Sequence, residues 1–94
     1  MSYELRFHPD ARKEWNKLDA TVREQFKKKL KERLQAPRVE SARVSGGYDL
    51  YKIKLRTAGY RLVYQVHDEQ MTVLVLAVGK RERNFAYKTG LGRL

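Results

Sequence analysis

The segment YKIKLRTAGYRLVYQV, residues 51–66, carries three cations whose spacing could hold a phosphate. Lys52 and Lys54 alternate with apolar residues in the first run, and Arg61 has the matching phase in the second run. Because side chains of one parity share a face of a β-strand, all three are expected on one side of a hairpin. Like charges held this close repel each other, so a purely structural sheet has no use for them. The alternative is edge protection, since lysines on an edge strand oppose aggregation.

The end of the next apolar run delivers more cations. The sequence GKRER supplies Lys80, Arg81 and Arg83, and Tyr87 follows. A tyrosine ring can stack on a base, and its hydroxyl can donate a hydrogen bond. A concave basic surface with an aromatic side chain predicts a binding site for single-stranded RNA.

Other chemistries find little support. The sequence has no cysteine, no Ser/His/Asp arrangement that can be placed, and no acidic or histidine cluster at metal-ligand spacing. His8 and His67 stand at a predicted helix start and strand end, where capping and surface roles are expected. The sequence thus predicts no metal site and no cofactor. A nuclease built on this chain must work with lysine, arginine and tyrosine.

The elements that would position these residues follow from periodicity. A strand over residues 2–7 precedes two amphipathic helices. The first helix begins at Pro9, which suits a first helical position, and the second begins with a capping box of Thr21 and Glu24 and ends at Pro37. A loop over residues 38–47 leads to strands over 48–56, 59–68 and 71–79. The last strand is apolar on both parities, as expected when both faces are covered.

The predicted order is βααβββ plus a C-terminal tail. This order indicates a small α+β fold in which two N-terminal helices pack on one mainly antiparallel sheet. Residues 80–94 are basic and contain Gly90 and Gly92, so a partly irregular or weakly helical tail is expected. The 94 residues are expected to form a single domain. No run of about 18 apolar residues and no secretory signal is present, which predicts a cytoplasmic protein without membrane contact.

The net charge of +10 is shared equally between the two halves of the chain. A basic body of this kind favours a polyanionic partner such as nucleic acid. The lysines of the second helix form either a solvated face or a patch for backbone phosphates. The candidate RNA-binding residues outside the hairpin face are Lys27, Lys28, Lys31, Arg43, Lys80 and Arg83.

Several segments together closely resemble the RelE toxins of bacterial toxin–antitoxin systems: KEWNKL, TVREQFKKKL, the Pro37–Arg38 pair, YKIKLR, GYRLVYQV and VGKRER. The resemblance runs from about Tyr3 to Tyr87. It implies the RelE-like microbial RNase fold and a metal-independent, ribosome-dependent endonuclease that cuts mRNA in the ribosomal A site. The implied partners are a RelB-like antitoxin, the 70S ribosome with its 16S rRNA, and operator DNA only through the toxin–antitoxin complex.

The resemblance also implies catalytic roles. Lys54 matches the general base for the 2′-hydroxyl, Lys52 and Arg61 match cations that hold the phosphate, Arg81 assists departure of the 5′ oxygen, and Tyr87 positions the nucleotide. An ordinary lysine is neutral in only about one molecule in 2,500 at pH 7. Crowding by other cations disfavours the charged form, so the cluster would lower the pKa of its own base.

Two other functions fit a basic chain of this kind. ParE-type toxins of the same superfamily poison DNA gyrase and have no need of this RNA-cleaving set. A non-catalytic RNA- or ribosome-binding domain would need basic charge without these particular residues.

Overall fold

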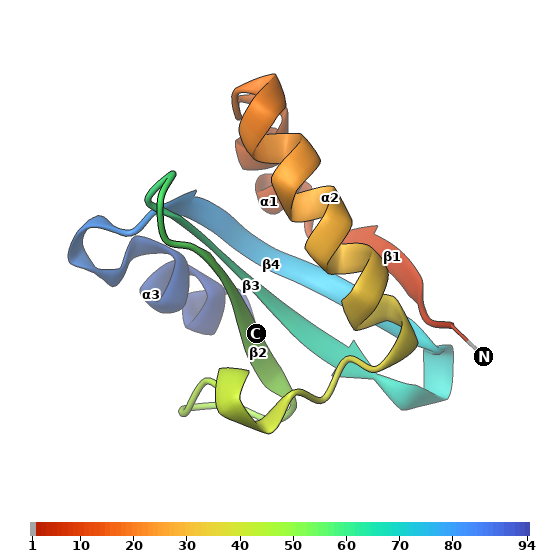
Figure 1. Cartoon of the computed structure of the whole chain (residues 1–94). Coiled ribbons are helices and arrows are strands. Elements are labelled where there is room, and N and C mark those ends of the chain that lie inside the picture. Colours follow the sequence, from red (N-terminus) through yellow and green to blue (C-terminus); the bar gives the residue numbers. More distant parts are fainter. Residues whose placement is uncertain (1) are drawn as a thin grey trace.

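The computed structural model describes residues 2–94, except for the side chain of Arg83. Its centre is one four-stranded sheet in the order β1-β4-β3-β2 (Figure 1). β2–β3 and β3–β4 are antiparallel, whereas β1 runs parallel to β4, so the mainly antiparallel sheet predicted from the sequence is confirmed. The strands are β1 (Glu4–Phe7), β2 (Leu50–Leu55), β3 (Tyr60–His67) and β4 (Thr72–Lys80).

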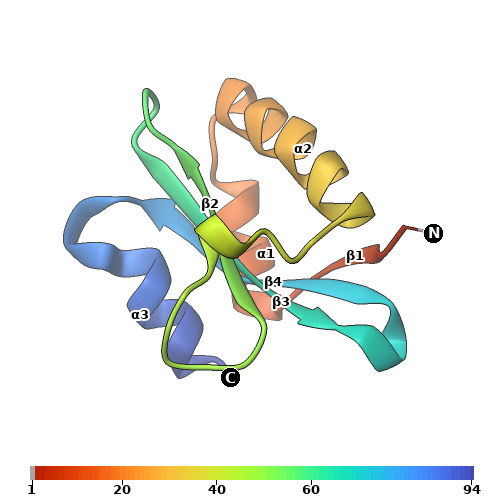
Figure 2. The same cartoon turned by 60° about the horizontal axis from the view of Figure 1, so that its bottom comes forward.

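Helices cover both faces of this sheet. α1 (Pro9–Asn16) and α2 (Ala20–Gln35) lie on one face, and α3 (Phe85–Gly92) lies on the other, as the two views in Figures 1 and 2 show. Three single 3-10 turns complete the order: η1 (Glu40–Ala42), η2 (Asp68–Gln70) and η3 (Glu82–Asn84). Within the described part of the chain, no helix is both long and apolar enough to cross a membrane.

The structure decides one sequence-based alternative and corrects one expectation. Of the irregular or weakly helical tail, it shows the helical form: η3 is followed by the eight-residue helix α3, which packs on the sheet through the buried Ala86 and Gly90. The N-cap of α2 is Asp19, whose carboxylate accepts from the backbone N–H of Thr21, and Thr21 itself lies inside the helix. An Asp cap serves the unpaired N–H groups of the first turn as well as the predicted threonine would.

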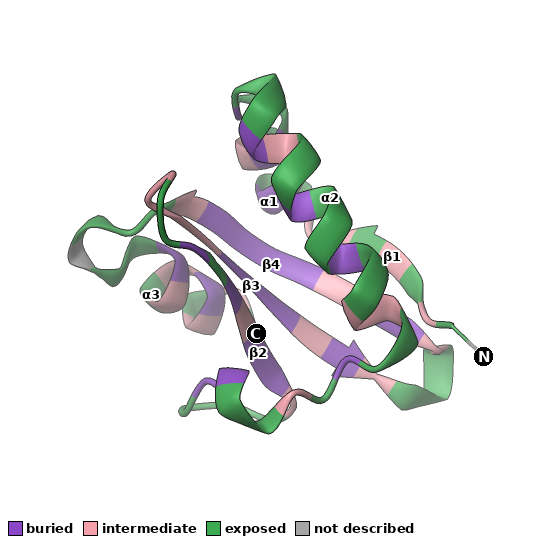
Figure 3. Ribbon diagram, in the orientation of Figure 1, coloured by how far each residue is buried: buried purple, intermediate pink, exposed green. Residues whose placement is uncertain are grey.

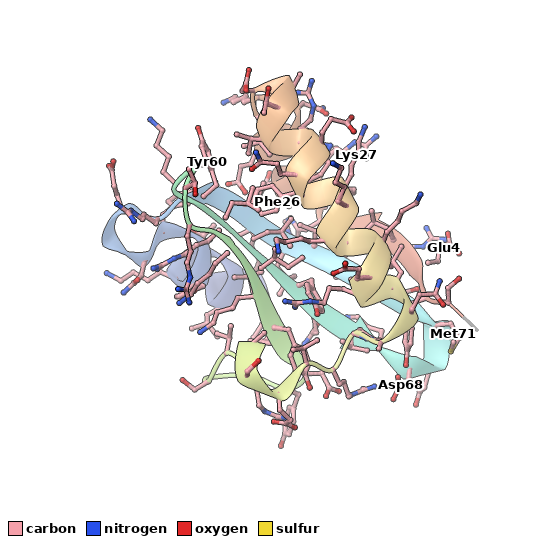
Figure 4. All side chains as sticks on the ribbon, in the orientation of Figure 1. Glu4, Phe26, Lys27, Tyr60, Asp68 and Met71 are labelled. Atoms are coloured by element: carbon pink, nitrogen blue, oxygen red, sulfur yellow. The ribbon has the colours of Figure 1, made fainter. Side chains whose placement is uncertain are left out.

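The core has two parts, one on each side of the sheet. Below α1 and α2, Trp15, Phe26, Tyr51 and Tyr64 pack with the apolar residues of β2, β3 and β4. Figure 4 shows Phe26 directed from α2 toward the sheet and Lys27 directed away from it. The second part lies under α3 and includes Leu50, Val63, Leu76 and Ala86. β4 is therefore buried on both faces (Figure 3), which confirms the sequence-based prediction for this strand.

A β-bulge interrupts the pairing of β3 with β4. Val63 pairs with Ala77, whereas the next residue, Tyr64, pairs with Val75, so Leu76 has no partner of its own. An extra residue of this kind bends a strand and increases its twist. Leu76 and Ala77 both belong to the core under α3.

The segment between α2 and β2, residues 36–49, contacts two other parts of the fold. Arg38 reaches Asp49 at 3.2 Å and Asp68 at 2.9 Å, which ties the segment to the end of β3. A Cβ on Gly47 would lie 2.8 Å from Leu94 Cδ1, so this loop passes directly beside the end of α3 (Figure 2). A side chain at this position would require the ends of the Leu50 and Leu94 side chains to shift.

Candidate active site

Lys54 and Arg61 are cross-strand partners in the β2–β3 hairpin. With Arg81 they line a hollow of about 230 Å³. Three of the predicted catalytic residues are therefore brought together as expected. The other residues around this hollow are Leu55, Arg56, Gly59 and Tyr60.

The hairpin turn holds Arg81 in place. The backbone N–H of Arg81 donates to the carbonyl of Gly59 at 2.9 Å. Gly59 has a φ of +75°, a conformation that residues with a Cβ rarely adopt. A Cβ there would lie 3.9 Å from Arg81 Nε, so the turn comes close to the guanidinium group. The turn thus joins the β2–β3 hairpin to the end of β4.

Tyr87 lies against the same cations from α3. Its ring centroid is 5.7 Å from Lys52 Nζ and 5.1 Å from Arg61 Cζ. Both separations fall within the range of cation–π attraction. The Tyr87 hydroxyl is buried and has no hydrogen-bond partner among the side chains that the structure describes, and this burial raises the pKa of the phenol. The expected open polar face of the hairpin is therefore covered in part by α3.

The pKa of Lys54 is lowered from its ordinary value. The largest cause is the positive charge of Lys52, followed by desolvation and by the charges of Arg61 and Arg56. Repulsion from fixed cations disfavours the ammonium form, as the clustered sequence pattern predicted. Because Lys54 is exposed, water also screens this repulsion.

Three residues that sequence reasoning did not select also reach this site. Asn84 accepts from Arg61 Nη1 at 3.0 Å, and its φ of +54° suits asparagine better than most residues. Arg56 continues the alternation of Lys52 and Lys54, a signal that could have identified it. Lys29 of α2 lines a second hollow with Lys54 and Arg56, an arrangement that only the packing of α2 on β2 determines.

The predicted RNA-binding residues lie at several places around the site. Lys27, Lys28 and Lys31 are exposed on α2 and line a groove with Leu5 and Leu34, and Lys27 also pairs with Glu24 at 3.2 Å. Lys27 and Lys31 therefore lie on the side of α2 that is nearer to β1, whereas Lys28 also lines a hollow with Lys29 and Leu55 of β2.

Two further candidates are not brought into the hollow. Arg43 reaches Glu40 at 3.4 Å, and its guanidinium carbon lies 5.9 Å from the ring centroid of Tyr51. Lys80 lines a separate hollow around Phe85 and Lys88. The side chain of Arg83 lies outside the part of the chain that the structure describes.

The two histidines lie away from the basic cluster. His8 Nδ1 accepts from the backbone N–H of Asp10, which confirms its expected capping role for α1. His67 is half-buried at the end of β3. Among the residues that the structure describes, no group of three His, Cys, Asp or Glu side chains could hold a metal ion.

Comparison with known proteins defines the class. The family of ParE toxins of type II toxin–antitoxin systems (parDE) matches residues 5–85. The chain is 55% identical to the mRNA interferase toxin RelE of Escherichia coli K12, over 100% of this chain and 99% of that protein. A relative named mRNA interferase RelE from Shigella flexneri has the same identity and coverage.

Solved structures agree with this assignment. A mutant of the E. coli toxin RelE in the free state matches with a TM-score of 0.92 and 53% identity, covering 100% of this chain and 99% of the other. The toxin in the intact E. coli RelBE toxin–antitoxin complex matches with a TM-score of 0.84 and 58% identity, covering 87% and 100%. The chain belongs to the RelE toxins of the RelE/ParE superfamily, as the sequence resemblance indicated.

Proposed function

We propose that this protein is a ribosome-dependent endoribonuclease, the toxin of a type II toxin–antitoxin pair, acting on mRNA in the A site of cytoplasmic ribosomes. The observation that carries the proposal is the meeting of Lys54, Arg61 and Arg81 around one hollow, with Lys52 and Arg61 against the Tyr87 ring. The similarity to toxins named mRNA interferase supports the same activity.

The proposed reaction uses the 2′-hydroxyl of the mRNA as nucleophile. Neutral Lys54 removes its proton, the 2′ oxygen forms a bond to the adjacent phosphorus, and the bond from phosphorus to the 5′ oxygen breaks. The products are a 2′,3′-cyclic phosphate and a 5′-hydroxyl, whose proton comes finally from solvent. Lys52 and Arg61 stabilise the extra negative charge on the phosphoryl oxygens. Arg81 stabilises the leaving oxygen by charge and hydrogen bonding, because its pKa makes it a weak proton donor.

Dependence on the ribosome follows from what this site lacks. A cluster of cations lowers the pKa of Lys54, but its exposure to water limits that effect. The chain offers no pair of histidines at the site to act as acid and base. Holding the 2′ oxygen in line with the leaving oxygen can supply several kcal/mol of the barrier, and the ribosome would provide that orientation.

The decisive experiment maps cuts by primer extension on an mRNA with an empty ribosomal A site and on the same RNA alone. We expect strong cutting, in phase with the codons, on the ribosome and negligible cutting of free RNA. A 2′-deoxy substitution at the cut nucleotide should block the reaction, and cutting of that substrate would exclude attack by the 2′ oxygen. Rapid cutting of naked RNA would instead identify a free-standing RNase.

Metal independence is part of the proposal and is supported by the lack of a ligand cluster among the described residues. Ribosomes themselves need magnesium, so the test uses exchange of magnesium for cobalt hexammine under conditions that keep the ribosome assembled. Unchanged single-turnover cutting is expected, because no inner-sphere ligand would be lost.

A second function, inhibition of DNA gyrase, is favoured by one observation: the family that matches residues 5–85 is that of the ParE toxins. Stabilised gyrase–DNA cleavage complexes without mRNA cutting would establish it. Inhibition of translation with neither kind of cut would indicate a binding protein. A RelB-like antitoxin is the proposed partner, by analogy with the E. coli RelBE complex, and operator DNA is expected to bind only that pair.

A further inference from the structure

The position of Tyr87 depends on a helix that cannot be stable alone. α3 has eight residues, and two of them are Gly90 and Gly92. Isolated helices shorter than about 12 residues are marginal in water, and each internal glycine costs about 1 kcal/mol relative to alanine. Contacts with the rest of the fold must therefore decide where α3, and with it Tyr87, lies.

Arg93, the residue directly after α3, makes the strongest polar contact of this region. Its two terminal nitrogens donate to the two carboxylate oxygens of Glu14 in α1, each at 2.9 Å. The side chains are only 16% and 21% exposed, so water screens this pair less than the surface pairs. A two-point contact of this kind fixes geometry as well as charge. Residues at opposite ends of the chain are thereby joined.

The pair also completes the hydrogen bonding of β4. β1 ends at Phe7, opposite Val75. Just beyond that point, the carbonyl of Leu76 accepts from Arg93 at 2.7 Å, and the N–H of Val78 donates to Glu14 at 3.2 Å. Glu14 and Arg93 thus supply partners that a longer β1 would have supplied. Since buried backbone groups without partners are costly, these bonds favour one position of the pair.

The position of α3 also affects the basic cluster around Lys54. Tyr87 lies six residues before Arg93, and its ring is in contact with Lys52 and Arg61. Lys52 is the largest cause of the lowered pKa of Lys54. The other charged groups around Lys54 are Arg56, Arg61, Arg81 and Lys29, from the hairpin, the end of β4 and α2. Loosening α3 would leave Arg56, Arg81 and Lys29 in place but would free Lys52 and Arg61 from the ring.

We propose that Glu14 and Arg93 are positioning residues of the active site, which hold the end of α3 so that Tyr87 keeps Lys52 and Arg61 beside Lys54. Neither residue touches the reacting atoms. The proposal rests on the proposed ribonuclease function. It also makes two claims that can be tested without RNA: the ion pair keeps α3 folded against the sheet, and it helps to keep the pKa of Lys54 low.

The test compares Arg93→Gln and Glu14→Gln with Arg93→Lys, which keeps a charge and a donor. Arg23→Gln is the matched control, since Arg23 also donates to backbone carbonyls, of Asn16 and Leu18, but contacts neither α3 nor the cluster. In the free protein, amide exchange of residues 86–92 and NMR titration of the Lys54 ammonium group are measured. On ribosomes, the single-turnover rate at saturating toxin is measured against pH.

We expect faster exchange in α3, a higher pKa of Lys54 and a rate lowered on the order of tenfold in both Gln variants, since small misplacements can cost up to about 100-fold. Arg93→Lys should recover most of each effect, and the control should lose stability alone. The proposal is overturned if the Gln variants melt earlier but keep the wild-type exchange in α3 and the wild-type pKa of Lys54. If wild-type toxin does not cut mRNA at all, the ribonuclease function fails, whereas the two NMR measurements still decide the role of the pair.

Discussion

Lys54 and Arg61 stand directly opposite each other in the β2–β3 ladder, two cations at one cross-strand position. Like charges at such a position destabilise a hairpin. The fold tolerates this repulsion at a site where crowded cations would both lower the pKa of a lysine base and bind phosphate.

Replacing Lys54 by Met should therefore raise stability while abolishing cleavage. The gain in Tm should be full below the folded pKa of Lys54 and should shrink as the pH rises through that pKa, because deprotonation then relieves the same repulsion in wild type. Thermal melts at several pH values check this. Added salt should reduce the gain. A Tm below that of wild type would show that the cluster costs no stability.

Arg61→Ala and Arg81→Ala should leave the fold intact and lower the rate of mRNA cutting about 100-fold or more, the usual effect of losing one group that stabilises a transition-state charge. Circular dichroism checks the fold, and primer extension on ribosome-bound mRNA checks the rate. Arg6→Ala is the control, because Arg6 forms an exposed pair with Glu4 on β1. A variant that cuts like wild type would remove that arginine from the site.

The pH dependence of cutting should report the general base. Lys54 must be neutral to act, so the single-turnover rate should rise with pH and level off above a pKa lower than that of ordinary lysine. Lys52→Gln removes the largest cause of the lowered pKa of Lys54, so the rising part of the pH–rate profile should move to higher pH. If the rising part of the profile stays at the same pH after this substitution, the pH dependence belongs to another group.

Tyr87→Phe should keep most activity and should not lower stability. The ring that contacts Lys52 and Arg61 remains. The substitution removes a buried hydroxyl that has no partner within the described part of the chain, and such a group costs about 1–3 kcal/mol when left unsatisfied. Tyr87→Ala should lower both the stability of the fold and the rate of mRNA cutting. If the Phe variant is as inactive as the Ala variant, the hydroxyl itself acts on the substrate.

Replacing Lys28 and Lys31 by Glu should weaken binding to the ribosome more than it changes the single-turnover rate at saturation. Both lysines are exposed on α2, and contacts between cations and backbone phosphates are sensitive to salt. Sedimentation with ribosomes at two salt concentrations measures the binding. Replacing Lys13 and Lys17 by Glu is the control, because both are exposed and the pair changes the net charge by the same amount. Equal losses in both variants would indicate a diffuse effect of net charge.

Alternation and caps were sufficient to predict most of this architecture. The parity of Lys52, Lys54 and Arg61 located the cluster before any fold was known, because a hairpin has only one way to place them. The apolar run of β4 predicted a strand covered on both faces. The sequence left α3 open between an irregular and a weakly helical segment, since two glycines and no clear apolar stripe obscure a helix whose stability comes from its contacts with the sheet.

Residues contributed by separate elements were harder to predict. Asn84 reaches Arg61 only because η3 turns the chain back over the sheet, and Lys29 lines a hollow with Lys54 only through the packing of α2. The bond between Glu14 and Arg93 spans almost the whole chain, and no local pattern indicates it. Sequence periodicity determines which face of its own helix or strand a residue occupies. These contacts depend instead on how the helices pack on the sheet.

The bulge at Leu76 shifts by one residue the alternation of side chains between the two faces of β4. Val73 and Val75 pack under α1 and α2 before it, but after it Ala77 packs under α3 and Val78 packs under α1 and α2. With unbroken alternation, Gly79 would face α1 and α2 instead of lying against Phe85, and the chain would enter η3 from the wrong side. One unpaired residue thus lets a single strand fill the core at one end and direct the chain toward the candidate active site at the other. Deleting a residue from β4 should be far more damaging than substituting the same residue.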